Sequence, residues 1–267
     1  MRISIITVVL NDPRVARALE SIFAQEVEAE VETIVIDGGS LPPTRDILER
    51  YRHRLSVFVS EPDRGLYDAM NKGLLYATGD IIGILNADDQ YADRFVLRDV
   101  AAVFSDPTVE ACYGDVVFVS PGTRRIVRYW RAGPYRRWKY YFGWMPPHQT
   151  FFARRSVYER FGGFNLDYRI AADYELMFRL LFVGAICVQY IPRVLACMDS
   201  GGISNRSLRS ILRGNWECWR TWKQHGLTPW GLLVPFAKPL RRLSHLLRRP
   251  AVLPEALHPP LVNAAEG

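Results

Sequence analysis

The sequence predicts an α/β fold with a mostly parallel central sheet and flanking helices. Residues 3–10 and 31–36 are short, continuous apolar runs rich in β-branched side chains, as expected of strands that are buried on both faces. A helical pattern follows each run, and two more strand-like runs occur before residue 86. Alternation of strands with helices is typical of a parallel sheet, because each helix returns the chain to the edge where the next strand begins.

The elements follow in order along the chain. The first helix is predicted to start with Asp12 as N-cap and Pro13 in the first helical position. Its apolar residues from Val15 to Phe23 recur at helical spacing and form one stripe. Up to residue 85 we predict a helix at 44–52, a strand at 55–59, a helix at 67–77 and a strand at 80–85. Beyond it we predict strands near 111–119, 124–130 and 148–155, followed by a helix at 172–183.

Charge divides the 267-residue chain into a body and an appendage. Residues 206–250 contain ten Lys or Arg and one acid, Glu217, whereas residues 1–205 contain 24 basic residues and 25 acids. The net charge of +6 is therefore a property of the C-terminal segment. Residues 206–249 are predicted to form a basic, amphipathic helical appendage, and residues 250–267, with four prolines, a loose tail.

Missing motifs argue against several classes of protein. The four cysteines are widely separated and form no CxxC motif, so neither a zinc site nor a disulfide framework is expected. The chain contains neither GxGxxG nor GxxxxGK[ST], which argues against nicotinamide, flavin and P-loop sites. It begins directly with a strand, without a signal peptide, and no apolar run approaches the roughly 20 residues that span a bilayer. We therefore expect a cytoplasmic protein.

Two adjacent acids, Asp88 and Asp89, follow the apolar strand predicted at 80–85. In an open α/β sheet, ligands bind outside the carboxyl ends of the strands. Paired carboxylates repel each other, and burying them is costly unless a cation or hydrogen-bond donors compensate. A divalent metal that holds a diphosphate is a natural compensator, because hard cations prefer oxygen ligands. The alternative is that one of the two acids is the N-cap of a helix that includes residues 94–103.

Polar residues also follow the first two predicted strands, as Asn11-Asp12 and as Asp37-Gly38-Gly39-Ser40. We expect them at the same edge of the sheet as the acidic pair. Asp37 can accept a hydrogen bond from a nucleobase or a ribose hydroxyl, and Gly38 lets backbone approach a ligand closely. Further along the chain, Arg64 or Lys72 can neutralise a phosphate. The alternatives are an ordinary glycine turn and a solvated helix start with a capping acid.

Four motifs occur in series along the first 89 residues. They are Asp37-Gly38-Gly39-Ser40, Ser60-Glu61-Pro62-Asp63-Arg64-Gly65-Leu66-Tyr67-Asp68-Ala69-Met70-Asn71-Lys72-Gly73, Ala77-Thr78-Gly79-Asp80 and Leu85-Asn86-Ala87-Asp88-Asp89. Together they resemble the motifs of family-2 glycosyltransferases, and in particular of those that build bacterial exopolysaccharides such as colanic acid. The resemblance covers roughly residues 1–205.

The resemblance implies a GT-A fold, Rossmann-like, with a nucleotide-binding half at 1–110 and an acceptor half at 111–205. It also implies a nucleotide-diphosphate sugar donor, a divalent cation (Mn²⁺ or Mg²⁺) and inversion at the anomeric carbon. Asp88 and Asp89 are implied as metal ligands, and the implied donor-binding residues are Asp37, Gly38, Arg64, Asn71, Lys72, Asn86 and Asp88. Two residues depart from the family pattern: Asn86 stands where many members have an acid, and Leu10 where an aromatic residue often stacks on the nucleobase.

Inverting glycosyl transfer needs a base that takes the proton of the acceptor hydroxyl while the diphosphate leaves on the opposite side. Asp173, at the start of the predicted helix 172–183, resembles the family's base; its alternative role is the N-cap of that helix. Glu175 is the second candidate, or else a first-turn acid that favours the helix dipole. His148 and Gln149 resemble a family segment on the acceptor side, where Glu175 is also placed, although His148 can equally be an ordinary loop residue.

The basic segment contains Trp216, Trp219 and Trp222, three residues apart, which predicts one aromatic face on a helix. A basic amphipathic helix with tryptophans is typical of an element that lies at an anionic membrane surface. The alternative is a helix that packs its tryptophans on the body and leaves its arginines in solvent. Nucleic-acid binding is not expected, because no nucleic-acid-binding motif accompanies the charge.

Two functions from different classes follow. The first is an inverting glycosyltransferase that moves a sugar from a nucleotide-diphosphate sugar to a hydroxyl of a growing, lipid-linked bacterial surface glycan, at the inner face of the cytoplasmic membrane. The second is a non-catalytic member that binds nucleotide sugar or scaffolds a membrane-associated glycan assembly complex. Asn86 in the acidic motif is the feature that favours the second.

Overall fold

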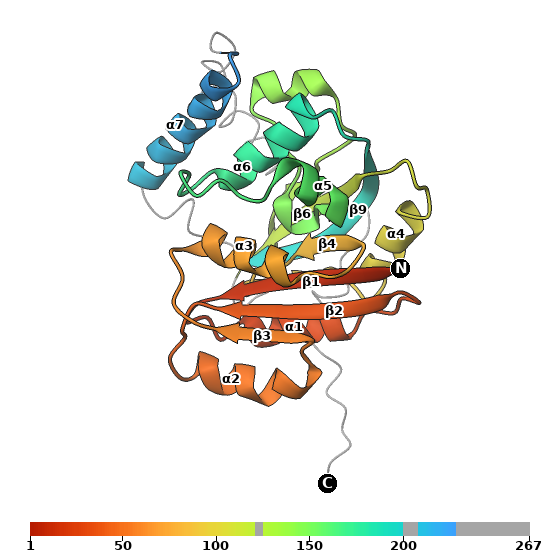
Figure 1. Cartoon of the computed structure of the whole chain (residues 1–267), viewed down its shortest axis with the longest axis vertical. Helices are drawn as coiled ribbons and strands as arrows, with labels where there is room; N and C mark the ends of the chain where they lie inside the picture. Colours follow the sequence, from red (N-terminus) through yellow and green to blue (C-terminus); the bar gives the residue numbers. More distant parts are fainter. Residues whose placement is uncertain (121–124, 200–207, 228–267) are drawn as a thin grey trace.

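One mixed sheet of nine strands runs through the residues that the computed structural model describes, which are 1–120, 125–199 and 208–227. Its strand order is β3-β2-β1-β4-β8-β6-β9-β5, and β7 pairs with β6. The strands are β1 (Arg2–Val9), β2 (Glu30–Asp37), β3 (Val57–Ser60), β4 (Ile81–Ile84), β5 (Asp89–Tyr91), β6 (Ala111–Val119), β7 (Ile126–Trp130), β8 (Phe152–Arg154) and β9 (Val188–Asp199). Figure 1 shows β1, β2 and β3 side by side in one half of the molecule.

The first half of the sheet is parallel, as the sequence predicts. β1 pairs in parallel with β2 and β4, and β2 with β3. The register sets Val9 opposite Asp37 and Asp37 opposite Ser60, so the carboxyl ends of these three strands meet at one edge. All residues of β1 from Ile3 to Val9 are buried. The continuous apolar runs in the sequence therefore come from strands that are covered on both faces.

Helices cover both faces of this parallel half. α3 (Leu66–Tyr76) packs on one face, in a cluster with Ile6 and Ile34 of the sheet. α1 (Val15–Phe23), α2 (Thr44–Tyr51) and α4 (Val96–Val103) pack on the other, around Ile3 and Val35. Figure 1 shows α3 and α1 on opposite sides of the strands.

The predicted start of the first helix is corrected by two residues. α1 begins at Val15, and its N-cap position is occupied by Arg14. The Asp12 carboxylate accepts the backbone N–H of Arg14 at 3.0 Å and pairs with the guanidinium of the same residue. Because this local contact uses the carboxylate, Asp12 closes a turn before the helix and does not cap it.

The second half of the sheet joins the first through β8, which is antiparallel to both β4 and β6. The strand predicted at 148–155 is corrected, because His148–Thr150 form a 3₁₀ turn, η3, and only β8 is extended. β9 is absent from the prediction; it pairs in parallel with β6 and antiparallel with β5. β5 begins at Asp89, whereas α4 begins at Val96 with Phe95 as N-cap. Neither acid of the pair therefore caps a helix.

Helices of the C-terminal half enclose an aromatic core. They are the 3₁₀ turn η2 (Arg137–Phe142), α5 (Arg155–Phe161), α6 (Ala172–Met177), the π-helical turn η4 (Phe178–Val183) and α7 (Leu208–Gln224). A further 3₁₀ turn, η1 (Arg52–Arg54), follows α2 in the first half of the chain. Trp222 of α7 is fully buried, and its ring lies 4.8 Å from Phe178 and 5.2 Å from Tyr141. Trp216 is 52% exposed. The expectation of one aromatic face is therefore corrected: the tryptophans are divided between core and solvent.

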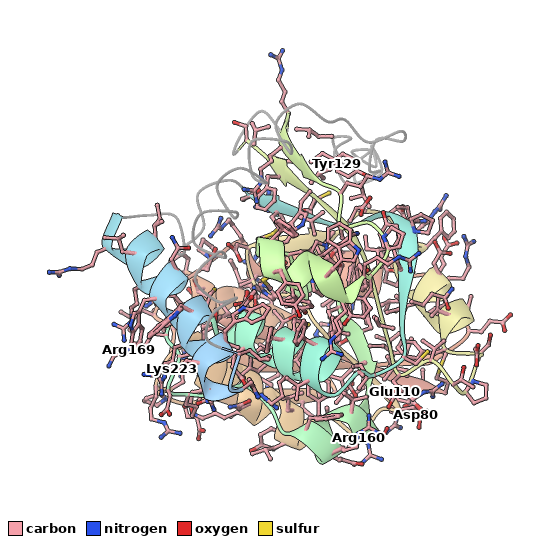
Figure 2. The ribbon with its side chains drawn as sticks, turned by 90° about the horizontal axis from the view of Figure 1, so that it is seen from above. Asp80, Glu110, Tyr129, Arg160, Arg169 and Lys223 are labelled. Carbon is pink, nitrogen blue, oxygen red and sulfur yellow. The ribbon has the colours of Figure 1, made fainter. Side chains whose placement is uncertain are left out.

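The predicted appendage is helical as far as Gln224, and its part beyond residue 227 lies outside the described residues, as does the predicted tail 250–267. Within the described ranges, every helix is too short or too polar to cross a bilayer. Figure 2 shows Arg169 and Lys223 on the side of the molecule that carries α7, whereas Asp80, Glu110 and Arg160 lie on a different side.

Candidate functional site

The parallel strands bring Asp37 to the edge where the acidic pair also lies. Asp37 ends β2 and is fully buried. Its carboxylate accepts the Ser40 backbone N–H at 3.0 Å and the Ser60 hydroxyl at 2.7 Å. A methyl group on Gly38 would clash with the Asp63 carboxylate, so the Asp63 side chain packs directly against the Gly38 backbone. The protein itself therefore holds the Asp37 carboxylate in one orientation.

Asp89 has no comparable support. The residue is 2% exposed, and neither of its carboxylate oxygens meets a hydrogen-bond donor among the described residues. Burial, and then the charge of Asp88, raise the pKa of Asp89 well above its ordinary value, and the Asn86 amide, which lies nearby but outside hydrogen-bond geometry, offsets only part of this rise. The amide oxygen of the nearby Asn86 is also buried without a donor in the same part of the chain. Buried acceptors of this kind are stabilised by a cation or by an incoming donor.

Asp88 is more exposed and lies next to an arginine. Its side chain is 26% exposed, and its carboxylate lies 3.8 Å from the guanidinium of Arg14. Burial raises the pKa of Asp88, and Arg14 partly offsets this effect. Arg14 also pairs with Asp12 and, at 3.4 Å, with Asp199, whose second partner is Arg17 at 2.6 Å. The acidic edge therefore carries two arginines.

Sequence reasoning missed Arg14, Arg17 and Asp199. Arg14 follows the first strand by a few residues, so its place at the strand ends was available as a signal for a cation at this edge. Asp199 ends β9, a strand that the sequence does not predict, and its contacts with α1 span more than 180 residues. No local pattern carries that information.

His148 connects the acidic motif to Asp173. Its Nε2 lies 3.2 Å from the Asn86 amide nitrogen, and its Nδ1 lies 3.5 Å from Oδ2 of Asp173. When the amide donates to Nε2, the ring carries its proton on Nδ1, on the side of Asp173. The side chains of His148 and Asp173 are 18% and 20% exposed. Residues that are far apart in the sequence thus form one contiguous site, and both Asp173 carboxylate oxygens face polar groups of other elements.

The other oxygen of Asp173 faces α3. The Tyr67 hydroxyl donates to the Ile170 carbonyl at 2.9 Å and lies 3.4 Å from Oδ1 of Asp173. Tyr67 also lines a cavity of about 510 Å³ whose wall includes Arg64, Leu166 and Arg169. A larger hollow of about 630 Å³ lies against Met1 and α4 and contains none of the predicted site residues. The smaller cavity is connected to Asp173 through Tyr67, and Arg64 is the predicted site residue that lines it.

The remaining predicted residues lie around this centre with structural contacts of their own. Arg64 is largely exposed and pairs with Asp68 at 2.8 Å. Asn71 donates to the Phe164 carbonyl and accepts the Phe164 N–H, both at 2.8 Å. Lys72 contacts Glu61 at 2.7 Å and the Pro62 carbonyl. The contacts of Arg64 and Lys72 hold the loop and first turn of α3, and those of Asn71 join α3 to the segment before α6. Donor binding by the three residues stays a prediction.

Gln149 and Glu175 are both buried. The side-chain oxygen of Gln149 meets no donor among the described residues, whereas both oxygens of Glu175 are bound by Arg179, at 2.9 and 3.0 Å. The Glu175 contact is that of a structural ion pair, and the acceptor-side role of both residues stays a prediction.

The donor atoms at the strand ends suit a hard cation. Asp89 and Asn86 present buried oxygens without donors, and Asp88 is accessible beside them. Over the described ranges, no three or more His, Cys, Asp or Glu side chains are grouped to hold a metal on their own. Mg²⁺ is commonly bound by one or two carboxylates together with substrate phosphates, and such a site needs only the residues present here.

Comparisons with known proteins identify the family. The model of Glycosyl transferase family 2 matches residues 4–172. An uncharacterized glycosyltransferase of Mycobacterium tuberculosis is 31% identical over 254 residues, which cover 92% of this chain and 90% of that protein. A PGL/p-HBAD biosynthesis glycosyltransferase of Mycobacterium bovis is 32% identical over 207 residues, covering 76% of this chain and 78% of the relative.

Solved structures share the fold at lower identity. Residues 1–349 of TarS from S. aureus, in complex with UDP-GlcNAc, match 83% of this chain with a TM-score of 0.64 and 18% identity. This chain spans 65% of that TarS fragment. The mannosyltransferase PcManGT from Pyrobaculum calidifontis, in complex with GDP-Man and Mn²⁺, matches 91% of this chain and is covered to 70%, with a TM-score of 0.61 and 20% identity. The mixed α/β sheet with flanking helices is the GT-A fold.

Proposed function

This chain belongs to glycosyltransferase family 2, and we propose that it moves a sugar, with inversion at the anomeric carbon, from a nucleotide-diphosphate sugar to a hydroxyl group of a lipid-linked glycan. The observation that carries the proposal is the contact chain from Asn86 through His148 to Asp173. It joins the polar edge of the parallel strands to the carboxylate that resembles the family's base.

The donor is proposed to lie across the carboxyl ends of β1, β2 and β4. Asp37, whose orientation is fixed by Ser40 and Ser60, would receive the nucleoside. Arg14 lies at the edge where the diphosphate is expected and supplies positive charge there. The nucleotide sugars in the TarS and PcManGT structures support this class of donor.

A divalent cation is proposed at the acidic pair. Asp89 and Asp88 would hold it with the Asn86 oxygen nearby, and the donor-free oxygens of Asp89 support this assignment. When bound, such a cation neutralises the charge that develops on the leaving diphosphate. The Mn²⁺ in PcManGT is consistent with this choice.

Asp173 is proposed as the base. The acceptor oxygen forms the new bond to the anomeric carbon while its proton passes to Asp173, and the bond from that carbon to the diphosphate breaks on the opposite side. The Nδ1 proton of His148 lies near Oδ2 of Asp173, and the backbone N–H of Tyr174 donates to Oδ1 at 2.7 Å; these two contacts keep the carboxylate oriented. The cavity lined by Tyr67, Leu166 and Arg169 lies on this side and would receive the acceptor.

The test is Asp173→Asn, with nucleotide release measured against a panel of nucleotide sugars and octyl glycosides in the presence of Mn²⁺. We expect transfer to fall by 10³-fold or more while calorimetry shows unchanged donor binding, because the substitution removes the base and keeps the shape of the side chain. Full activity of the variant would overturn the assignment of Asp173.

A non-catalytic, nucleotide-sugar-binding role is the second candidate, and Asn86 in place of an acid favours it. Calorimetry with UDP, GDP and their sugars, with and without Mn²⁺, followed by a donor-hydrolysis assay separates the two. Binding without turnover of any donor or acceptor would support the second role.

Membrane proximity is part of the proposal, because lipid-linked acceptors lie at a bilayer. The outward face of α7 exposes Leu212 (61%) and Trp216 (52%), flanked by Arg209, Arg213 and Arg220. Apolar residues among basic ones suit the surface of an anionic leaflet. We therefore propose peripheral binding at the inner face of the cytoplasmic membrane. Flotation with vesicles of phosphatidylcholine, with and without phosphatidylglycerol, measures it; equal flotation of wild type and Trp216→Ala would argue against this face.

A further inference from the structure

Glu217 is the one acid in a segment with ten basic residues, and it is completely buried. Its carboxylate accepts three successive backbone N–H groups: Arg169 at 3.1 Å, Ile170 at 2.9 Å and Ala171 at 2.8 Å. The guanidinium of Arg213, one turn earlier on α7, donates to the same carboxylate at 3.0 Å. The contacts of Glu217 therefore reach from the C-terminal helix into the main body of the chain.

The three N–H groups belong to the loop that leads directly into α6, two residues before Asp173. α6 has Ala171 as N-cap and no side chain of its own that caps it. Glu217 accepts the backbone N–H of the N-cap residue Ala171, which is the bond that a Glu at position N3 makes in a capping box. On the other side of the loop, the Ile170 carbonyl accepts the Tyr67 hydroxyl at 2.9 Å. The backbone at Ile170 is thus held between α7 and α3.

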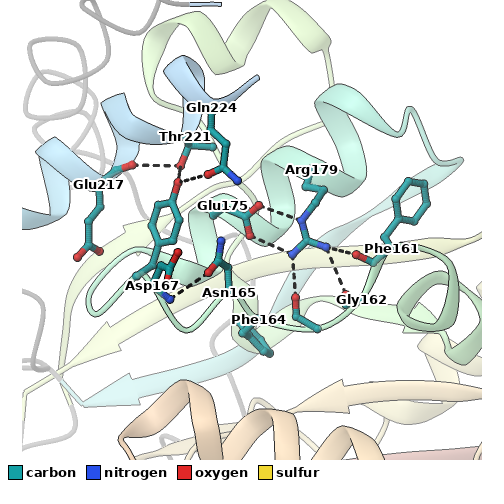
Figure 3. A network of polar contacts seen from close by, with 12 residues as sticks. Phe161, Gly162, Phe164, Asn165, Asp167, Glu175, Arg179, Glu217, Thr221 and Gln224 are labelled. Carbon is teal, nitrogen blue, oxygen red and sulfur yellow. Dashed lines mark hydrogen bonds and ion pairs between the residues drawn. The ribbon is translucent and has the colours of Figure 1, made fainter. Parts of the chain in front are cut away.

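Other contacts of α7 surround the same short segment. The Trp222 indole donates to the Tyr174 hydroxyl at 2.9 Å, on the residue that follows Asp173. The Tyr168 hydroxyl donates to Gln224 at 3.1 Å, next to Thr221 (Figure 3). Gly214 faces Ile170 so closely that a methyl group there would lie 3.1 Å from the Ile170 side chain. α7 therefore contacts the chain both before and after Asp173.

We propose that Glu217 is a positioning residue for Asp173, and that α7 is a required part of the active site because it fixes the backbone from which this carboxylate projects. The proposal depends on the role of Asp173 as base. Asp173 must reach both His148 and the acceptor hydroxyl, and a shift of about 1 Å in a reacting group costs on the order of 10²-fold in rate. Three backbone hydrogen bonds to one buried carboxylate are well placed to prevent such a shift.

The test compares Glu217→Gln with Glu32→Gln in the full-length chain. Glu32 is a matched control, since it is buried and its carboxylate accepts the backbone N–H of Thr78 at 2.9 Å, but it lies on β2 toward the amino end of the strands, away from Asp37. The readouts are kcat and KM for nucleotide release from UDP-glucose, UDP-GlcNAc or GDP-mannose with octyl glycosides as acceptors, and calorimetry with the same donors.

For Glu217→Gln we expect kcat to fall about 10- to 100-fold, with the KM and dissociation constant of the donor within about twofold of wild type. Glu32→Gln is expected to keep the wild-type kcat. An unchanged kcat for Glu217→Gln overturns the proposal. So does a parallel loss of donor binding, because general disruption of the fold would then explain the effect.

Gly214→Ala provides a second variant, which decides the matter if Glu217→Gln does not fold. It retains Glu217 and all charges, and alanine favours a helix, but the added methyl group pushes against Ile170. We expect kcat to fall about 3- to 10-fold with unchanged donor binding; wild-type kcat would overturn the proposal. Asp173→Asn separates the two hypotheses: if it is fully active, the assignment of the base fails, whereas an inactive Asp173→Asn beside a fully active Glu217→Gln refutes only the positioning role.

Discussion

Asp89 and Glu217 are both buried carboxylates, one in each half of the site, and their surroundings are opposite. Glu217 accepts three backbone N–H groups and the guanidinium of Arg213. The oxygens of Asp89 meet no donor among the described residues, and its neighbour Asp88 is a like charge. Burial alone therefore does not tell a structural acid from a ligand-binding one. The number of hydrogen-bond donors around the carboxylate distinguishes the two kinds of acid, because a buried carboxylate without donors is stable only with a cation or a proton.

The largest effect is expected for substitution of Asp89, the buried acid without hydrogen-bond donors. Asp89→Asn should lower sugar transfer by about 10³-fold, because a charged ligand that stabilises the leaving diphosphate is lost. The same variant should also lose the increase in melting temperature that Mn²⁺ gives to the wild type, since binding to the folded state is the source of that increase. Differential scanning fluorimetry with and without Mn²⁺ measures the second effect without any need for turnover.

Asp80→Asn is the matched control for this prediction. Asp80 lies just before β4, at the other end of the strand from the acidic pair, and accepts the backbone N–H of Arg2 at 2.9 Å. It should keep both activity and the Mn²⁺-dependent shift. A full Mn²⁺ shift in Asp89→Asn would remove the contrast between the two buried acids.

Substitution of Glu217, the buried acid with several hydrogen-bond donors, should instead affect stability. Glu217→Gln is expected to lower the free energy of unfolding by about 2–4 kcal/mol, because backbone N–H groups and Arg213 lose a charged acceptor in a buried site. The loss should be the same with EDTA and with Mn²⁺. Urea unfolding followed by circular dichroism measures this loss of stability. A loss that depends on Mn²⁺ would mean that Glu217 takes part in cation binding and is not a purely structural acid.

The parallel half of the fold was predictable because its information is local. β1 and β2 are continuous apolar runs, and their ends bring Asp37 and the acidic pair to one edge. β9 was not predictable from the sequence, because Pro192 and Arg193 interrupt its buried positions and its pairing partner β6 lies some 75 residues earlier. Long strands inside mixed sheets owe their stability to partners that are distant in sequence, and no short pattern marks them.

The candidate site divides in the same way. The acids at the strand ends could be found from the sequence, because strand and turn chemistry are local signals. The contact of Asn86 with His148 joins residues 62 positions apart, and that of Glu217 with Ile170 joins residues 47 apart. In the sequence Glu217 is the one acid of a basic segment, and only tertiary packing identifies it as an acceptor for backbone N–H groups.

The pH dependence of stability offers a third way to separate the two acids. Burial and Asp88 raise the pKa of Asp89 well above its ordinary value of 3.8. The metal-free folded state thus keeps a proton on Asp89 at pH values where the unfolded chain has lost it, and stability falls as the pH rises through that window. In EDTA, Asp89→Asn should therefore be more stable than wild type near neutral pH, by about 1–2 kcal/mol, with the difference vanishing below pH 3.8.

Urea unfolding of both proteins between pH 3.5 and 7.5 tests this sign. Because Asp88 and Asp115 also have raised pKa values from burial, the difference between variant and wild type is the informative quantity. A variant that is less stable than wild type at neutral pH in EDTA would mean that the folded protein already satisfies Asp89.

The smallest effect concerns His148, which links the two halves of the site. His148→Phe keeps a flat ring but removes the contacts with Asn86 and Asp173, at 3.2 and 3.5 Å. A polar contact of this kind with the base contributes about 1 kcal/mol net, so we expect kcat to fall about tenfold while Mn²⁺ binding at Asp89 is retained. His53→Phe, on an exposed 3₁₀ turn, is the control. A loss of 10³-fold or more would make His148 itself the proton acceptor and reduce Asp173 to its support, whereas an unchanged kcat would mean that the halves act without this link.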